Sequence, residues 1–144
     1  MLKGLVCLVL GLMIHSDPVF AVDRMEILQG AEHGNMNDAY FLGVMYRTGA
    51  GVAPDCGEAL KWTRQAALHG HALAQSHLGM LYREGCEPNV TKEPSTAYFW
   101  TTLAAKQGLQ VAERNLAELE GLLHPYLIAE ARNKAENFKP IEGN

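Results

Sequence analysis

Apolar residues recur at helical spacing along most of the chain, and the segments that carry them alternate in character. Two segments, 36–48 and 72–84, carry large apolar side chains and a glycine along one stripe. Two others, 56–69 and 94–107, place alanines and one tryptophan at the same spacing. Because a helix completes a turn every 3.6 residues, each pattern predicts an amphipathic helix with one apolar face. We therefore expect four helices here, two of a first type (A) and two of a second type (B).

The alternation reflects an internal repeat, in which matching residues lie either 36 or 38 positions apart. Identical residues recur 36 or 38 positions later in these pairs: Gly34 and Gly70, Leu42 and Leu78, Gly43 and Gly79, Tyr46 and Tyr82, Gly49 and Gly85, Val52 and Val90, Ala59 and Ala97, Trp62 and Trp100, Ala66 and Ala104, Ala67 and Ala105, Gly70 and Gly108. Such a period is typical of a solenoid with one two-helix hairpin per repeat. We expect full units at about 34–70 and 70–108, with partial units at both ends.

The end of the chain has the character of a cap. After a third A-type segment at about 110–123, His124 and Pro125 interrupt the pattern, and a last helix begins at Pro125. Its apolar stripe consists of Leu127 or Ile128, Ala131, Ala135 and Phe138. A terminal repeat needs a polar outer face, so we interpret 124–144 as a capping helix and tail; a partner-binding amphipathic helix is the alternative. The predicted fold class is all-α, a short α–α solenoid over 22–123 closed by this cap.

The first 21 residues are typical of an export signal. Lys3 precedes an uncharged apolar run at 4–14, and Val19 and Ala21 stand at positions −3 and −1 of a cleavage site. Eleven apolar residues are too few to cross about 30 Å of hydrocarbon. We expect a signal peptide at 1–21, export to the periplasm or the medium, and no stable membrane insertion.

The net charge and the absence of common catalytic motifs disfavour several classes of function. Twelve basic and sixteen acidic residues give a net charge of −4, without the clustered Lys and Arg that a nucleic-acid surface needs. The sequence lacks the common nucleophile, zinc-protease and phosphate-binding motifs. We expect no catalytic residues, no cofactor and no nucleic-acid partner. Asn89 begins an N-V-T triplet, a glycosylation acceptor only in an organism that glycosylates exported proteins.

Three histidines, His69, His71 and His77, lie close together in the sequence and raise the question of a metal site. His33, His69 and Gln107 hold the same repeat position, each directly before a glycine. That position is the end of a B helix, where glycine adopts the left-handed conformation and histidine meets the negative end of the helix dipole. The set has no fixed ligand spacing, so we expect no metal.

The repeat pattern A-x-x-x-L-G-x-x-Y-x-x-G-x-G-V-x-x-D-x-x-x-A-x-x-W-x-x-x-A-A-x-x-G resembles the Sel1-like repeat, a relative of the tetratricopeptide repeat. It stands as "LGVMYRTGAGVAPDCGEALKWTRQAALHG" at 42–70 and as "LGMLYREGCEPNVTKEPSTAYFWTTLAAKQG" at 78–108. The second copy differs in its loop, where Glu87 replaces a glycine and two residues are added. The resemblance implies an α-solenoid that binds proteins or glycans on a concave surface, usually without catalysis.

In such a fold, Cys56 and Cys86 return to the same end of two adjacent antiparallel helices. Neighbouring helix axes lie 8–10 Å apart, so these loop cysteines come within reach of the 4.4–6.8 Å Cα separation of a disulfide. An oxidising compartment favours such a bond. We hypothesise a Cys56–Cys86 disulfide; two free loop thiols are the alternative.

The phase of the A helices predicts a partner-binding stripe. With Leu42 and Tyr46 buried, the side turned away carries Tyr40, Val44, Arg47, Ser76, Met80, Arg83, Arg114 and Glu118. Aromatic and Arg side chains dominate contact energetics, which suits an interaction surface. Packing of these residues against neighbouring A helices is an equally weighted alternative.

Together these features predict an exported, noncatalytic protein-interaction module, an adaptor or regulator of another envelope protein. A secreted factor that acts on a host protein is the second possibility. An enzyme acting on cell-wall or β-lactam substrates is the third, although no nucleophile and base set supports it.

Overall fold

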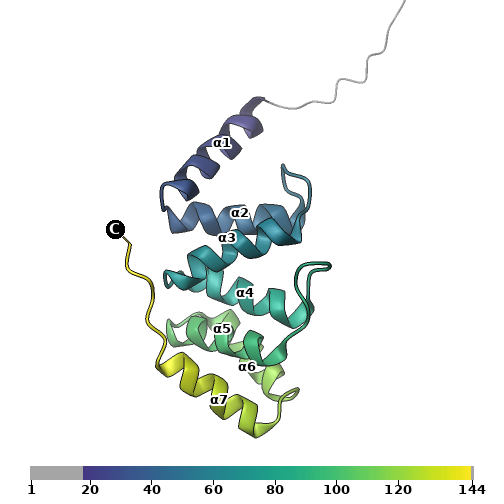
Figure 1. Ribbon diagram of the computed structural model, residues 1–144, viewed down its shortest axis with the longest axis vertical. Helices are drawn as coiled ribbons and strands as arrows, with labels where there is room; N and C mark the ends of the chain where they lie inside the picture. Colours follow the sequence, from purple (N-terminus) through teal and green to yellow (C-terminus); the bar gives the residue numbers. More distant parts are fainter. Residues whose placement is uncertain (1–17, 144) are drawn as a thin grey trace, which may run out of the picture.

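The computed structural model describes residues 18–143, and these form seven α-helices that stack in chain order along the long axis of the molecule (Figure 1). The helices are α1 (Pro18–Glu32), α2 (Met36–Thr48), α3 (Cys56–Leu68), α4 (Ala72–Glu84), α5 (Pro94–Lys106), α6 (Gln110–Glu120) and α7 (Pro125–Glu136). Within the described part there is no strand, only an isolated bridge between Cys86 and Val90. The all-α class predicted from the repeat is confirmed.

The helices pair as the repeat predicts. The A-type α2 packs on the B-type α3, and α4 packs on α5, which gives two hairpins. The hairpins stack through α3 on α4 and α5 on α6, while α1 covers α2 at the amino-terminal end. The third A helix stops at Glu120 rather than 123, because the chain must turn before His124, whose Nδ1 accepts a hydrogen bond from the Tyr126 amide.

Large apolar side chains fill the space between successive helices. Leu42, Leu78 and Leu81 of the A helices and Trp62 and Trp100 of the B helices form one buried cluster. Five of the six alanines of the B helices are fully buried beside them, and Ala105 is partly buried. Apart from Leu81, these are positions that recur in the sequence, so repeated residues form most of this core.

Glycine permits close contact inside each hairpin. A Cβ atom on Gly43 would lie 3.0 Å from the backbone nitrogen of Thr63, and one on Gly79 would lie 3.1 Å from the Ala97 carbonyl oxygen. The threonine hydroxyls of Thr63 and Thr101 also point at these glycines. Because backbone atoms cannot move aside cheaply, no larger residue fits where the A and B helices cross.

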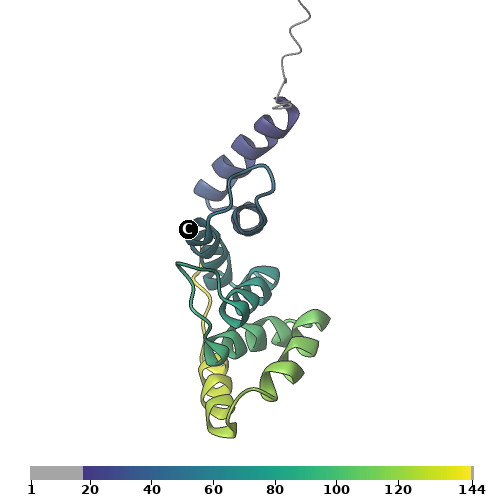
Figure 2. The same ribbon diagram turned by 90° about the vertical axis from the view of Figure 1, so that its right-hand side faces the viewer.

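The last hairpin departs from the pattern of the others. Helix α7 packs mainly on α5 rather than on α6, and Figure 2 shows α6 and α7 diverging to opposite sides. Side chains bridge the gap: the Tyr98 hydroxyl donates to Glu120 Oε1 of α6 (2.8 Å) and accepts from Arg132 Nε of α7 (2.9 Å). One buried phenol therefore connects three helices.

The tail after α7 extends the cap. Phe138 packs edge-to-face on Phe99 and Trp100, with ring centroids 6.0 and 5.9 Å apart. The chain then returns toward the first hairpin, where the Ile141 amide donates to the Leu68 carbonyl oxygen of α3 (2.9 Å) (Figure 1). The predicted stripe is buried at Ala131 and Ala135, with Ile128 rather than Leu127 in the core cluster, so α7 serves as a cap within this molecule.

The expected export signal lies mainly outside the described residues. Residues 1–17 are not part of the description, whereas helix α1 begins at Pro18 and so includes the expected cleavage site after Ala21. Among the described helices, none combines the length and the apolar character needed to cross a membrane.

The close contact of the two helices in each hairpin can be tested with Gly79→Ala. Alanine favours a helix by about 1 kcal/mol over glycine, but overpacking against backbone costs about 1–3 kcal/mol, so we expect a net loss in the free energy of unfolding. Gly121→Ala is the matched control, because Gly121 is helical in φ and ψ and its nearest neighbour leaves ordinary van der Waals room. Urea denaturation that finds Gly79→Ala as stable as Gly121→Ala would contradict the close contact.

Candidate functional site: the A-helix surface and a groove beside the last helix

The A-helix surface, meaning the outer side of α2, α4 and α6, carries the eight residues predicted to bind a partner. The structure brings most of them into contact with the next A helix. Arg47 of α2 forms an ion pair with Glu84 of α4 and reaches Met80 Sδ at 4.0 Å. Packing between neighbouring A helices, the alternative considered above, describes what these side chains do in the structure.

A row of ion pairs, the charge ladder, crosses this surface near the carboxyl-terminal ends of α2, α4 and α6. Arg83 of α4 lies 2.8 Å from a carboxylate oxygen of Glu118 on α6 and 3.3 Å from one of Glu84. Together with the Arg47 pair, these contacts connect three successive repeats. Because the pairs are partly exposed, each contributes only up to about 1 kcal/mol, and their main effect is to fix the orientation of the arginines.

An aromatic cluster occupies the amino-terminal half of the surface. Tyr40 of α2 stacks on His71 (ring centroids 5.2 Å apart) and meets His77 edge-on (6.1 Å). Ser76 is only 8% exposed, so it is not available to a partner as predicted. Helix α4 is covered by both α3 and α5, and Ser76 lies on a covered side of the helix.

His71 acts as the amino-terminal cap of α4. Its Nδ1 accepts the Ala74 backbone N–H (3.1 Å), and its Nε2 therefore carries the proton and donates to Asn37 Oδ1 of α2 (2.9 Å). Burial lowers the pKa of His71 below its usual range. Sequence reasoning placed this histidine at a turn but missed the cap and the contact with α2.

His77 is buried in the contact between α2 and α4. Its Nε2 has no hydrogen-bond partner. Burial lowers its pKa to about 4, helped by the positive charge of Arg47 and opposed by Glu84. The side chain is therefore neutral at physiological pH.

The A-helix surface exposes apolar side chains as well as charged ones such as Glu118. Each A helix exposes one large apolar side chain: Phe41 on α2 (52% exposed), Leu73 on α4 (45%) and Val111 on α6 (41%). Arg114, one of the predicted residues, is exposed beside Val111 on α6. Sequence reasoning missed the three apolar residues, although Leu73 and Val111 share a repeat position and could have been found that way.

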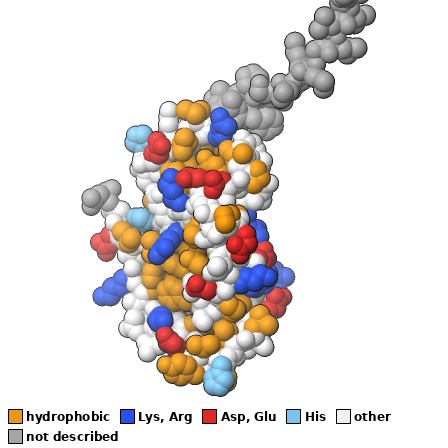
Figure 3. Space-filling view, turned by 45° about the vertical axis from the view of Figure 1, so that its right-hand side comes forward, with side chains coloured by type: hydrophobic (Ala, Val, Ile, Leu, Met, Phe, Trp, Pro, Cys, Tyr) orange, Lys and Arg blue, Asp and Glu red, His pale blue; other side chains and the backbone are white. Residues whose placement is uncertain are grey.

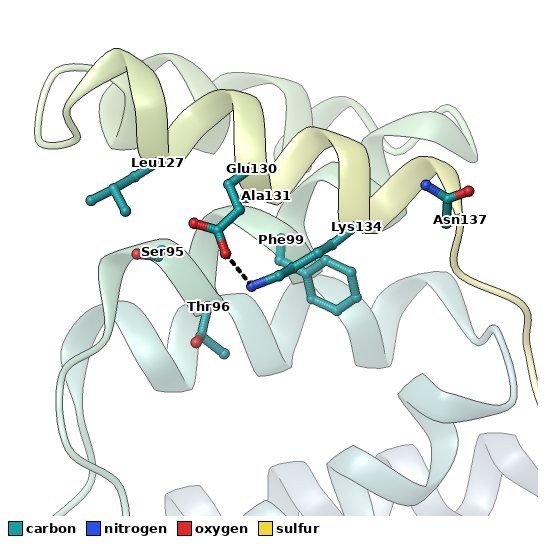
Figure 4. Close-up of a pocket in the computed structure, with 8 residues that line it drawn as sticks. All are labelled: Ser95, Thr96, Phe99, Leu127, Glu130, Ala131, Lys134 and Asn137. Carbon is teal, nitrogen blue, oxygen red and sulfur yellow. Dashed lines mark ion pairs between the residues drawn. The ribbon is translucent and has the colours of Figure 1, made fainter.

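A groove of about 510 Å³ lies between α5 and α7. Phe99, Leu127 and Ala131 give it an apolar lining, and Glu130 and Lys134 form an ion pair of 2.7 Å at its mouth (Figure 4). Its remaining lining residues are Ser95, Thr96 and Asn137. Hydrophobic side chains also gather across the middle of the face in Figure 3, bordered by acidic and basic ones. The sequence did not reveal the groove, because it exists only where α7 packs on α5.

The structure joins Cys56 and Cys86 in a disulfide with a Cα–Cα distance of 5.6 Å. The bond connects the first turn of α3 to the loop after α4, where Cys86 and Val90 form their bridge. The predicted geometry, two cysteines at one end of adjacent helices, is the geometry observed. Asn89 is exposed in the same loop.

His33 and His69 have helix-end roles. His33 Nδ1 donates to the Gln29 carbonyl oxygen (2.6 Å), and His69 Nδ1 donates to that of Gln65 (2.8 Å), each at the end of a B-type helix. Across residues 18–143, no group of three or more His, Cys, Asp or Glu side chains is placed to hold a metal ion.

Comparison with known proteins identifies the repeats. The profile of the family described as Sel1 repeat matches residues 38–71 and 72–109. The chain is 41% identical over 75 residues to "Chitin synthase regulatory factor 3" of Schizosaccharomyces pombe, which is 51% of this chain and 8% of that protein. It is 33% identical over 90 residues to "Chitin synthase regulator SKT5" of Saccharomyces cerevisiae, which is 62% of this chain and 13% of that protein. The chain thus spans only a small part of both relatives.

Two solved structures share the architecture. One is c5321, described as a protective antigen present in uropathogenic Escherichia coli strains with an SLR fold: TM-score 0.67, 32% identity, covering 78% of this chain and 25% of that one. The other is a Sel1 repeat protein from Oxalobacter formigenes: TM-score 0.61, 29% identity, covering 79% and 88%. Both confirm the predicted solenoid.

The disulfide leads to a prediction about stability. Closing a loop between residues 30 apart constrains the unfolded chain, so reduction should lower the free energy of unfolding by roughly 3–4 kcal/mol. The single variant Cys86→Ser and the double variant Cys56→Ser with Cys86→Ser should both lose this stability, and a reductant should then have no further effect on them. Wild-type protein whose denaturation midpoint is the same with and without reductant would contradict the bond.

Proposed function

The chain belongs to the Sel1 repeat family, and we propose that it is an exported, noncatalytic module that binds another envelope protein and acts as an adaptor or regulator. The single observation that supports this most directly is the accessible part of the A-helix surface. There Phe41, Leu73 and Val111 each expose apolar area on one of three consecutive A helices, and Arg114 is exposed on α6. Exposed aromatic and arginine side chains are typical of protein interfaces.

The contacts beneath this surface favour a preformed binding site. The Arg47–Glu84 and Arg83–Glu118 pairs and the Tyr40 stack hold α2, α4 and α6 together. A partner would meet side chains that need little reordering, which lowers the entropic cost of association. The absence of a nucleophile–base motif in the sequence supports a noncatalytic role.

The relatives support a regulatory role in general terms. Both yeast proteins carry the word regulator or regulatory in their names, and their similarity to this chain covers the repeats. The export part of the proposal rests on the leader-like segment at 1–21. A second candidate, a secreted factor that contacts a host protein, is favoured by the likeness to the E. coli protective antigen.

A double variant of the accessible surface tests the binding role. Phe41→Ser with Arg114→Glu should weaken partner capture from native envelope extract by about 10- to 100-fold or more, because hot-spot residues each contribute on the order of 1–2 kcal/mol. Both side chains are exposed, so the helical circular dichroism should not change. Leu127→Ser in the groove between α5 and α7 is the control and should capture the same protein as the wild type. Equal capture by the double variant and by the wild type would reject the A-helix surface.

Export has its own measurement. The secreted or periplasmic form should begin at Val22, and intact mass with amino-terminal sequencing after fractionation would show this. Retention in the periplasm supports the adaptor role, and accumulation in the medium supports the host-directed one. A cytoplasmic protein that retains Met1 to Ala21 would exclude both.

A further inference from the structure

Two histidines lie in the contact between α2 and α4. His71, the N-cap of α4, and His77, within α4, lie against the same tyrosine of α2: His71 stacks on the Tyr40 ring at 5.2 Å, and His77 meets it edge-on at 6.1 Å. This contact joins the A helices of the first and second repeats. It lies outside the tightly packed interiors of the hairpins, where the threonines face the glycines.

Protonation of His71 would break its cap. Nδ1 accepts the Ala74 N–H, so a proton on this nitrogen removes the acceptor and leaves two N–H groups facing each other. The new positive charge would also lie at the amino-terminal end of α4, where the helix dipole disfavours cations. The link from Nε2 to Asn37 of α2 depends on the orientation that the cap gives the ring.

Protonation of His77 would place a positive charge in a buried site that offers its Nε2 no hydrogen-bond acceptor. The residue is 8% exposed and its Nε2 has no hydrogen-bond partner. The charged groups that face it are Arg47 of α2, which repels a second positive charge, and Glu84 of α4, which attracts it. Glu84 already pairs with Arg47 and Arg83, so little of its charge remains to compensate a histidinium.

We propose that the α2–α4 contact is an acid-sensitive joint of the solenoid, closed while His71 and His77 are neutral and loosened when they are protonated. Loosening separates the first repeat from the second, because Tyr40 and the Arg47–Glu84 pair lie across the same contact. The crossing points of the hairpins, where Gly43 faces Thr63 and Gly79 faces Thr101, contain neither histidine. The joint is a property of this chain alone and does not depend on any partner.

The direction of the pH effect follows from the lowered pKa values. A group whose folded pKa lies below its unfolded value stabilises the fold above the unfolded pKa and loses that contribution as the pH falls. For His77 the loss begins near pH 6.5 and is complete only below about pH 4. His77 alone should lower the folding equilibrium constant roughly tenfold between pH 7.5 and pH 5.5.

The repeats themselves supply matched variants for the test. The first repeat has Phe41 at the position of His77, and asparagine is a good helix cap that does not titrate, so the joint variant is His77→Phe with His71→Asn. The second repeat has Gln107 at the position that His69 holds in the first, so the control is His69→Gln. Urea denaturation of the full chain at pH 7.5 and pH 5.5 gives the equilibrium constants, and hydrogen exchange at the Ala74 amide reports on the cap.

The wild type and His69→Gln should both lose about tenfold or more in the equilibrium constant, with a lower hydrogen-exchange protection factor at the Ala74 amide at pH 5.5 than at pH 7.5. The joint variant should lose less than half of that on a logarithmic scale and should keep its protection factor. A joint variant that loses as much as the wild type overturns the proposal. If the variant does not fold, a nuclear magnetic resonance titration of the wild type decides: a His77 pKa below about 5 with a matching shift of the Tyr40 ring supports the joint, and a pKa above 6 overturns it.

Discussion

The close approach of the A and B helices inside each hairpin is the constraint on which the rest of the structure depends. Gly43 and Gly79 allow the A helix to lie against the backbone of its partner, at 3.0 and 3.1 Å from where a Cβ would stand. With the hairpins this thin, the tryptophan of one repeat and the leucines of the next can share a continuous core. A larger residue at either crossing would separate the helices and open voids along that core.

The contacts across the A-helix surface hold the array together and also support the proposed binding site. The charge ladder and the Tyr40 cluster hold neighbouring repeats in register, and they also fix the frame from which Phe41, Leu73 and Val111 project. A binding surface of this kind is as rigid as the stacking beneath it. Because burial favours the neutral form of both histidines of the Tyr40 cluster, the rigidity of the frame is coupled to their protonation.

The helices at the carboxyl-terminal end of the array pack differently from the others because no further repeat covers them. With no further repeat to cover it, α7 packs on α5, and Tyr98, Glu120 and Arg132 bridge the space left beside α6. The tail then contacts α5 through Phe138 and α3 through the Ile141 amide. The groove beside Phe99 is a by-product of this closure.

The sequence by itself determined the helices, the repeat, the hairpin pairing and the place of the two cysteines. Each of these depends on spacing along the chain, as with Leu42 and Leu78 or Cys56 and Cys86, and spacing is visible in one dimension. The tertiary structure decided which of the predicted side chains stay free: Arg47 and Arg83 carry the right chemistry for a partner but pair with the next A helix, and Ser76 is buried. It also determined that His71 caps α4, that Nε2 of His77 has no partner, and that α7 packs on α5. These depend on the distance and angle between helices that are not neighbours in sequence, and side-chain packing sets those quantities, not the repeat period.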